Sequence, residues 1–179
     1  MNDLPPFAQH FILHWGEMGT KWGINRTVAQ IHALLFLSEE PLNAEDICNR
    51  LGVARSNVSN SLKELQNWGI VKSVHLPGDR RDHFESIKDV FELFRVIAAE
   101  RKKREIDPTL TTLRECAEEA GQAKDSADLY AKGQLEDLLG FFELASDFYE
   151  KMNKLPTQTA VKVVRMGDKL AKNLGIISK

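Results

Sequence analysis

Cysteine is scarce in this chain of 179 residues, which contains only Cys48 and Cys116. Two thiols are too few for the disulfide framework of a small secreted domain, and we expect both to be buried and unreactive. No apolar run approaches the roughly 20 residues that cross a bilayer. Residues 1–15, MNDLPPFAQHFILHW, have neither the basic start nor the small-residue cleavage site of a signal peptide. These absences predict a cytoplasmic protein with no membrane partner.

Motifs of catalysis are also missing. The sequence contains no phosphate-binding loop, no nucleophile elbow and no paired acid–base motif. His10, His14 and Glu17 share one helical face at a spacing that zinc can use, but no partner cluster of Cys or His accompanies them. We therefore expect no enzymatic activity, no bound metal and no cofactor.

Net charge is only −2, so bulk charge does not indicate a polyanionic partner. Its distribution is uneven, because residues 50–104 carry 12 basic and 7 acidic side chains, whereas the segments on either side are net acidic. Phosphate neutralisation by Lys and Arg dominates nucleic-acid affinity, so a polyanion would bind in the middle third. A solvated surface of mixed charge is the alternative interpretation.

Apolar residues recur at helical spacing through the first third of the chain. Gly19 and Gly23 are expected to bracket a break between the first two helices. Asn43 is a good N-cap for the third helix, and Gly69 is the expected left-handed cap of the fourth. The predicted helices cover about residues 5–18, 24–38, 43–51 and 55–68.

The pattern then changes to period two, which predicts strands at residues 70–75 and 83–87 around a turn at Pro77-Gly78. Helical periodicity resumes at 88–105. Asp107-Pro108 predicts a helix restart, with Asp as the cap and Pro in the first turn. Two further helices are expected, one carrying the apolar positions from Leu135 to Met152 and the last over 158–173.

This order predicts a mainly α fold with a small β-hairpin wing, namely a winged helix-turn-helix plus a helical dimerisation region. We expect N-terminal scaffold helices in residues 1–38, the winged helix-turn-helix in 39–88, and helices for dimerisation and effector binding in 89–179. The terminal helices carry more apolar surface than a small winged domain can cover, which predicts a homodimer.

The fourth predicted helix has a face suited to DNA. On a helical wheel Val58, Leu62 and Leu65 share the core side. The opposite side is polar, and Glu64 is the sole acid between Arg55 and Asn67. Such a helix can enter the major groove and offer hydroxyls, amides and a cation to base edges. An ordinary surface helix is the alternative.

The predicted hairpin carries Arg80 and Arg81 side by side at its tip. Arginine at a hairpin tip suits the narrow, strongly negative minor groove. Asp79 or Asp82 could hold one guanidinium in a bidentate pair and fix its direction. A solvated turn is the alternative, and the arginines become informative because they follow a predicted helix-turn-helix.

The segment LNAEDICNRLGVARSNVSNSLKELQNWGIVKSVHLPGDRRDHFE resembles the winged helix of MarR-type regulators. A longer match, over about residues 15–115, is to the GbsR-like branch, which resembles regulators of choline and glycine-betaine metabolism. The resemblance implies a dimeric repressor bound to a near-palindromic operator in double-stranded DNA. Ala54 departs from the Ser or Thr expected as the N-cap of the fourth helix. The family's DNA contacts fall on Arg55, Ser56, Asn57, Ser59, Asn60 and Lys63 in this helix and on Arg80 and Arg81 in the wing.

Phe11, Trp15 and Trp22 gather near the N-terminus and could bind an effector. A small cationic or zwitterionic ligand would use such rings as a cation–π cage, with Glu17 nearby. Packing of the rings in the core or at a dimer interface is the alternative.

Two function classes remain. One is a sequence-specific DNA-binding transcriptional regulator, a repressor that responds to a small metabolite. The other is a winged-helix protein-interaction module without DNA binding, which would have little reason to combine a double arginine in the wing with an acid-poor fourth helix.

Overall fold

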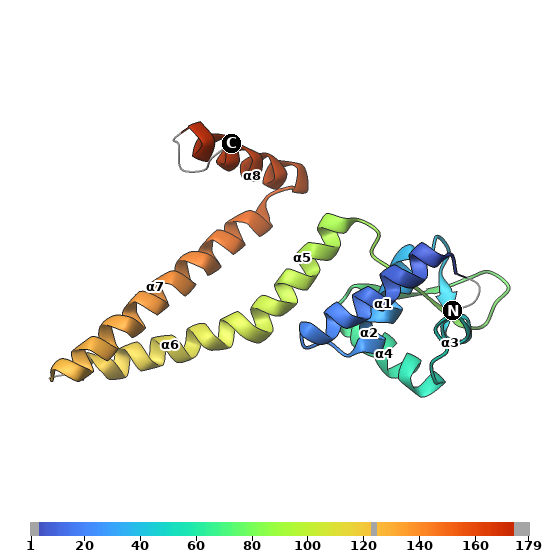
Figure 1. The fold of residues 1–179 in the computed structure, drawn as a ribbon, viewed down its shortest axis with the longest axis horizontal. Coiled ribbons are helices and arrows are strands. Elements are labelled where there is room, and N and C mark those ends of the chain that lie inside the picture. Colours follow the sequence, from blue (N-terminus) through green and yellow to red (C-terminus); the bar gives the residue numbers. More distant parts are fainter. Residues whose placement is uncertain (1–3, 123–124, 174–179) are drawn as a thin grey trace. The chain divides into compact units, whose positions relative to one another are not determined.

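The computed structural model describes residues 4–122 and 125–173. The chain divides into two compact units, the first ending at Ile97 and the second beginning at Ala98 (Figure 1). The first unit therefore contains both of the segments expected as an N-terminal scaffold and a winged helix-turn-helix.

The first unit is a helical domain with a small antiparallel sheet in the order β1-β3-β2. Strand β1 is only two residues long and was not predicted; it pairs with β3 at Leu42–Phe84 and Asn43–His83. The elements of this unit are α1 (Pro6–Lys21), α2 (Arg26–Leu37), β1 (Leu42–Asn43), α3 (Ala44–Leu51), α4 (Arg55–Asn67), β2 (Val71–His75), β3 (Asp82–Ser86) and the start of α5 (Val90–Arg101).

Helix α1 is longer than predicted, because Gly19 lies inside the helix and is buried. A Cβ added to Gly19 would lie 2.5 Å from the Cβ of Ala29 on α2. The missing side chain therefore lets α1 and α2 approach closely, and the prediction of a break at Gly19 was wrong. The chain turns instead at Gly23, whose φ of 76° is in the left-handed region.

The core of the first unit lies where α2, α3 and α4 meet. Val58 and Leu65 of α4 are fully buried and Leu62 nearly so, as their wheel positions predicted. They pack in one cluster with Ile12, Ile31, Leu34, Leu35 and Ile47. This packing fixes which side of α4 faces outward.

The second unit is built on a helical hairpin. Figure 1 shows α6 (Asp107–Glu119) and α7 (Ser126–Lys154) side by side, and Arg114 of α6 contacts Glu143 of α7 at 2.9 Å. Leu110 and Leu113 of α6 are buried in this unit. A short 3₁₀ turn (Ala120–Gln122) follows α6, and α8 (Thr157–Asn173) follows α7.

Helix α6 begins at Asp107 with Pro108 in its first turn, as predicted, but Asp107 does not cap it and no break in the helical chain precedes it. Asp107 has helical dihedral angles, and a π-helical turn (Lys102–Ile106) joins α5 to α6. Proline removes one backbone donor and its ring clashes with the preceding turn, and a widened π turn relieves both effects without ending the helix. Instead of capping, the Asp107 carboxylate binds the Lys102 ammonium at 2.6 Å, and Glu150 of α7 lies 3.3 Å from the same nitrogen.

Candidate nucleic-acid interface

Helix α4 is preceded and followed by turns that local chemistry fixes. Helix α3 before it has a capping box, in which the Asn43 side chain accepts from the Asp46 backbone and the Asp46 carboxylate accepts from the Asn43 backbone. Gly52 then ends α3 in the left-handed conformation, and Gly69 follows α4 with a φ of 72°. The Asn43 and Gly69 caps agree with the sequence prediction.

The outward side of α4 consists of the side chains predicted to contact DNA. Every one of them is exposed, because Val58, Leu62 and Leu65 occupy the inward side. We call this set the α4 outer face: Arg55, Ser56, Asn57, Ser59, Asn60 and Lys63.

The start of α4 carries no side-chain cap. Ala54 is extended and makes no capping hydrogen bond, as its identity indicates. The first backbone N–H groups of α4 therefore receive no acceptor from a capping side chain, and such groups together with the helix dipole favour an anion. A DNA phosphate is an anion of this kind, so Ala54 is compatible with the predicted interface.

The two arginines of the hairpin turn differ in their surroundings. Arg81 is held by Asp79 through Nη2–Oδ2 at 2.6 Å and Nε–Oδ1 at 3.0 Å, and its Nη1 lies 3.5 Å from Glu45 of α3. This guanidinium holds the pKa of the Asp79 carboxyl well below its usual range. Arg80 is exposed, and no carboxylate of the described residues pairs with it. Of the two acids expected to fix an arginine, Asp79 does so.

His83 forms the base of this arrangement. Its ring is buried, with Nδ1 3.0 Å from the Arg81 carbonyl oxygen and Nε2 3.5 Å from the Asp79 carboxylate. Neither His83 nor Glu45 was predicted from the sequence, since neither belongs to the basic pattern at the hairpin tip. Alternation within the strand was the signal that could have placed His83 on the buried side.

The three rings of the predicted effector site lie together in the first unit. Phe11 stacks on Trp15 with centroids 5.3 Å apart, and Trp22 meets Trp15 edge-on at 5.7 Å. Phe11 and Trp15 pack against the core, whereas Trp22 is exposed. The rings contact one another in series, so a ligand between them would have to displace one ring.

Helix α2 adds two aromatic residues that were not predicted from the sequence. His32 lies 6.4 Å from Trp15 and 6.3 Å from Phe36, measured between ring centroids. Burial, aided by the nearby Lys88 ammonium, lowers the pKa of His32 to about 4, and its Nε2 has no hydrogen-bond partner among the described residues. His32 is therefore neutral at physiological pH.

Lys88 joins the end of the sheet to the end of α2. Its ammonium donates to the carbonyl oxygen of Leu35 at 2.7 Å, to that of Phe36 at 3.2 Å and to that of Ser38. A cation at these terminal carbonyls also complements the negative end of the helix dipole. The contact spans about fifty residues of sequence, so no local pattern indicated it.

Neither a metal site nor a membrane span is found in the part of the chain that the structure describes. Within residues 4–122 and 125–173 there is no group of three or more His, Cys, Asp or Glu residues placed to hold a metal ion. Among the described helices, none has the length and apolar character needed to span a bilayer.

Comparisons with known proteins agree with this geometry. Residues 22–82 match the MarR family. The HTH-type transcriptional repressor GbsR of Bacillus subtilis (strain 168) is 22% identical over 136 residues, which cover 75% of each chain. The putative HTH-type transcriptional regulator YvaV of the same organism is 22% identical over 85 residues, 48% of each chain.

A crystal structure of a transcriptional regulator has the same fold, with a TM-score of 0.58 at 17% identity over 84% of this chain and 100% of that one. The segment that matches the MarR family contains α2, α3, α4 and the arginine turn. The chain is thus a DNA-binding transcriptional regulator with a MarR-type winged helix.

Proposed function

We propose that this regulator represses transcription as a homodimer, with the α4 outer face in the major groove and the arginine turn in the adjacent minor groove. Two observations together carry the proposal. The exposed face of α4 has few acids, and the Arg81 guanidinium of the hairpin turn is held in place by the Asp79 carboxylate. In this proposal the protein acts by binding rather than by catalysis, and it acts in the cytoplasm.

The α4 outer face supplies the base contacts. Asn57 and Asn60 are amides that pair with adenine edges, and Arg55 or Lys63 can pair with guanine or neutralise a phosphate. Ser56 and Ser59 are short hydroxyls that allow the helix backbone to approach the groove closely. The backbone N–H groups at the start of α4 add a phosphate contact.

The two arginines take separate roles in the wing. Arg81 is preorganised by Asp79, so less side-chain entropy is lost when it enters the minor groove. Arg80 carries an exposed positive charge with no carboxylate partner among the described residues, and it can follow the phosphate backbone. Losing Arg80 should chiefly flatten the salt dependence of binding, whereas losing Arg81 should chiefly weaken affinity for the specific site.

Gel-shift titrations at several salt concentrations test these roles. Arg80→Ala should reduce the slope of log affinity against log salt by about one unit, and Asp79→Asn should weaken specific binding although it removes a negative charge. Lys21→Ala, an exposed cation of α1, is the matched control. Equal affinity and equal salt dependence for the wild type and the Arg80→Ala/Arg81→Ala double variant would exclude the hairpin turn as a DNA contact.

The homodimer follows from the geometry of operators. One winged helix reads a half-site, and two half-sites lie about 34–36 Å apart, which requires two linked copies. Exposed apolar side chains on α5 and α7 supply surface for such a contact. Light scattering should give twice the chain mass of 20.3 kDa. A monomer that binds the operator tightly would contradict the proposal.

A small cationic or zwitterionic metabolite is proposed as the effector, bound at Phe11, Trp15 and Trp22. Trp22 offers an accessible ring, and Glu17 of α1 carries an exposed carboxylate. A ligand changes DNA affinity only if it binds one state more tightly, and displacement of a packed ring would provide that difference. Titration calorimetry with choline and with betaine, together with tryptophan fluorescence, tests this. If neither produces heat or quenching, and Trp15→Ala only lowers thermal stability, the rings belong to the core alone.

A further inference from the structure

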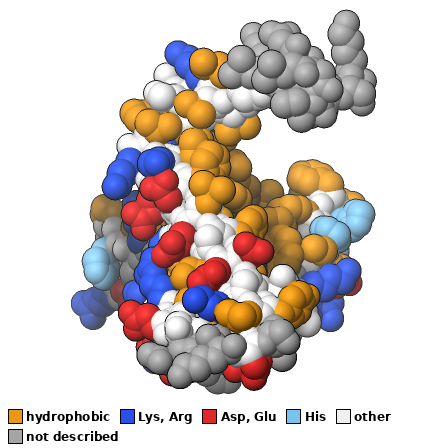
Figure 2. All heavy atoms as spheres, turned by 90° about the vertical axis from the view of Figure 1, so that its left-hand side faces the viewer, with side chains coloured by type: hydrophobic (Ala, Val, Ile, Leu, Met, Phe, Trp, Pro, Cys, Tyr) orange, Lys and Arg blue, Asp and Glu red, His pale blue; other side chains and the backbone are white. Residues whose placement is uncertain are grey.

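One ion pair of the hairpin turn joins it to a different element. The Nη1 atom of Arg81 lies 3.5 Å from the carboxylate of Glu45, which belongs to the first turn of α3. Acidic and basic side chains lie among one another on the surface that Figure 2 shows, so an exposed ion pair by itself indicates little. The Glu45 contact is more informative, because Arg81 is the arginine that the proposed function places in the minor groove.

The pairing of β1 with β3 brings Glu45 to Arg81. Asn43 pairs with His83 in this antiparallel ladder, Glu45 follows Asn43 by two positions and Arg81 precedes His83 by two. The same register therefore sets the two side chains against each other where α3 begins. The Asn43 side chain also accepts from the Glu45 amide at 2.9 Å, which fixes the Glu45 backbone. The fold itself thus builds this contact.

The Arg81 guanidinium divides its donors between two carboxylates. Asp79 accepts from Nε at 3.0 Å and from Nη2 at 2.6 Å, whereas Glu45 lies at Nη1. The hydrogen bonds to Asp79 raise the pKa of Arg81 most, and the charge of Glu45 adds to this effect. Nη1 is the nitrogen that Asp79 leaves for another acceptor, and the minor groove offers acceptors on adenine and thymine edges. Glu45 and DNA therefore compete for the same end of the guanidinium.

Asp79 and Glu45 differ in whether they can move with the arginine. Asp79 lies in the hairpin turn two positions before Arg81 and also accepts from the Arg81 backbone amide at 2.9 Å. Glu45 lies on α3, whose first turn is held by the capping box. An Arg81 side chain that enters the minor groove can therefore keep Asp79 but must leave Glu45.

We infer that Glu45 sets the operator affinity of this regulator by holding Arg81 in the free protein and opposing its transfer to DNA. Glu45 is a positioning residue that acts through Arg81 and against binding, whereas Asp79 acts in favour of binding. The inference rests on the proposed function, because it requires Arg81 in the minor groove. Exposed ion pairs are weak, so this contact should lower the affinity by no more than about fivefold.

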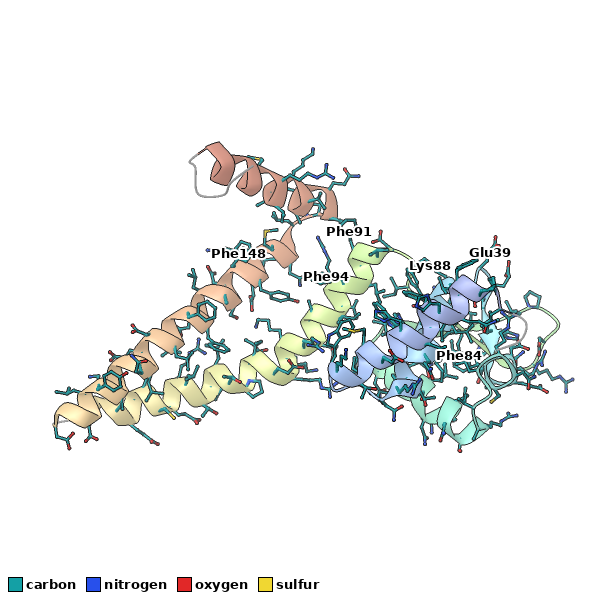
Figure 3. All side chains as sticks on the ribbon, in the orientation of Figure 1. Glu39, Phe84, Lys88, Phe91, Phe94 and Phe148 are labelled. Atoms are coloured by element: carbon teal, nitrogen blue, oxygen red, sulfur yellow. The ribbon has the colours of Figure 1, made fainter. Side chains whose placement is uncertain are left out.

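Glu45→Gln tests the inference, because glutamine keeps the length of the side chain and the backbone cap but removes the charge. The probe is a DNA duplex that the wild-type protein selects from a random library, and gel-shift titration at low salt gives the dissociation constant. Glu45→Gln should tighten binding about two- to fivefold. In an Arg81→Ala background the same change should tighten it much less, because the ion pair is already absent. Glu39→Gln removes an exposed acid of the same unit, labelled in Figure 3, and is the matched control for net charge.

The outcomes separate this inference from the proposed function. Unchanged or weaker binding by Glu45→Gln overturns the inference, and so does equal tightening in the Arg81→Ala background or by Glu39→Gln. If Arg81→Ala itself leaves the affinity unchanged, or if no duplex is selected, the proposed place of Arg81 in the minor groove fails as well. Circular dichroism checks that Glu45→Gln is folded. Should it not be, Glu45→Asp keeps the charge at the start of α3 but shortens its reach toward Nη1, and binding should tighten in the same direction.

Discussion

The two units of this regulator bury their apolar side chains to different degrees. In the first unit Ile12, Ile31 and Ile47 have no exposed surface, whereas the described hydrophobic side chains of the second unit that are buried are Leu110 and Leu113, at 5% and 7%. Both units use amphipathic helices, but α7 is apolar on two sides, and the second unit covers only one of them. The first unit therefore covers its own apolar surface, whereas the second leaves one apolar side of α7 exposed, which a second copy would cover in the proposed homodimer.

Truncation of a core side chain in the first unit should have the largest effect on stability. Ile31→Ala removes fully buried methylene groups and should lower the free energy of unfolding by about 2–5 kcal/mol, equally at low and high protein concentration. Phe141→Ala truncates an exposed ring and should instead reduce the dependence of the melting temperature on concentration. Thermal unfolding followed by circular dichroism measures both. If both variants changed stability by the same amount and with the same dependence on protein concentration, the two units would not differ as described.

Acid should act on the first unit through His32. Its pKa is about 4 in the folded protein and has its ordinary value of 6.5 in the unfolded chain, which therefore binds the extra proton first as pH falls. Stability should decline from pH 6.5 toward pH 4, by about 3 kcal/mol in total. Urea denaturation across this range measures the slope. His32→Leu should remove this part of the decline, and the exposed His14→Leu should retain it.

Two helical glycines differ in the space around them: Gly19 of α1 lies against Ala29 of α2, whereas Gly140 of α7 has no neighbour within 4 Å among the described residues. Gly19→Ala forces a Cβ to 2.5 Å from that of Ala29 and should destabilise the first unit by about 1–3 kcal/mol. Chemical denaturation measures the loss. Retention of full stability would mean that α1 and α2 can separate at no cost.

The smallest expected effect has the opposite sign. A Cβ added to Gly140 of α7 meets nothing within 4 Å among the described residues, so Gly140→Ala should gain about 0.5–1 kcal/mol from its higher helix propensity. The gain should appear as a higher melting temperature of the second unit. A loss of stability would show that the Gly140 side of α7 is covered in solution.

Sequence periodicity predicted the elements whose causes are local. Asn43 marked the start of α3 and Gly69 the end of α4, because caps act within a single turn of helix. The inward and outward sides of α4 followed from its wheel for the same reason. The exposed residues of the α4 outer face could therefore be named from the sequence alone, and their contact with DNA stays a prediction.

Contacts between distant segments could not be predicted in this way. Gly19 reads as a helix breaker until Ala29 is found against it, and β1 exists because β3 pairs with it. The ammonium of Lys88 finds its acceptors at the end of α2. Sequence also left open which acid holds an arginine of the wing, and the structure selects Asp79 through the turn at Gly78.

Asn43 links two parts of the winged helix that are separate in the sequence. Its side chain accepts from the Glu45 and Asp46 amides at 2.9 and 3.0 Å, while its backbone pairs with His83 in the sheet. The first turn of α3 therefore cannot open to solvent without loosening the base of the hairpin, and the two should exchange their amide hydrogens in one cooperative event. An operator that holds the hairpin as proposed would consequently slow amide exchange in the first turn of α3 as well.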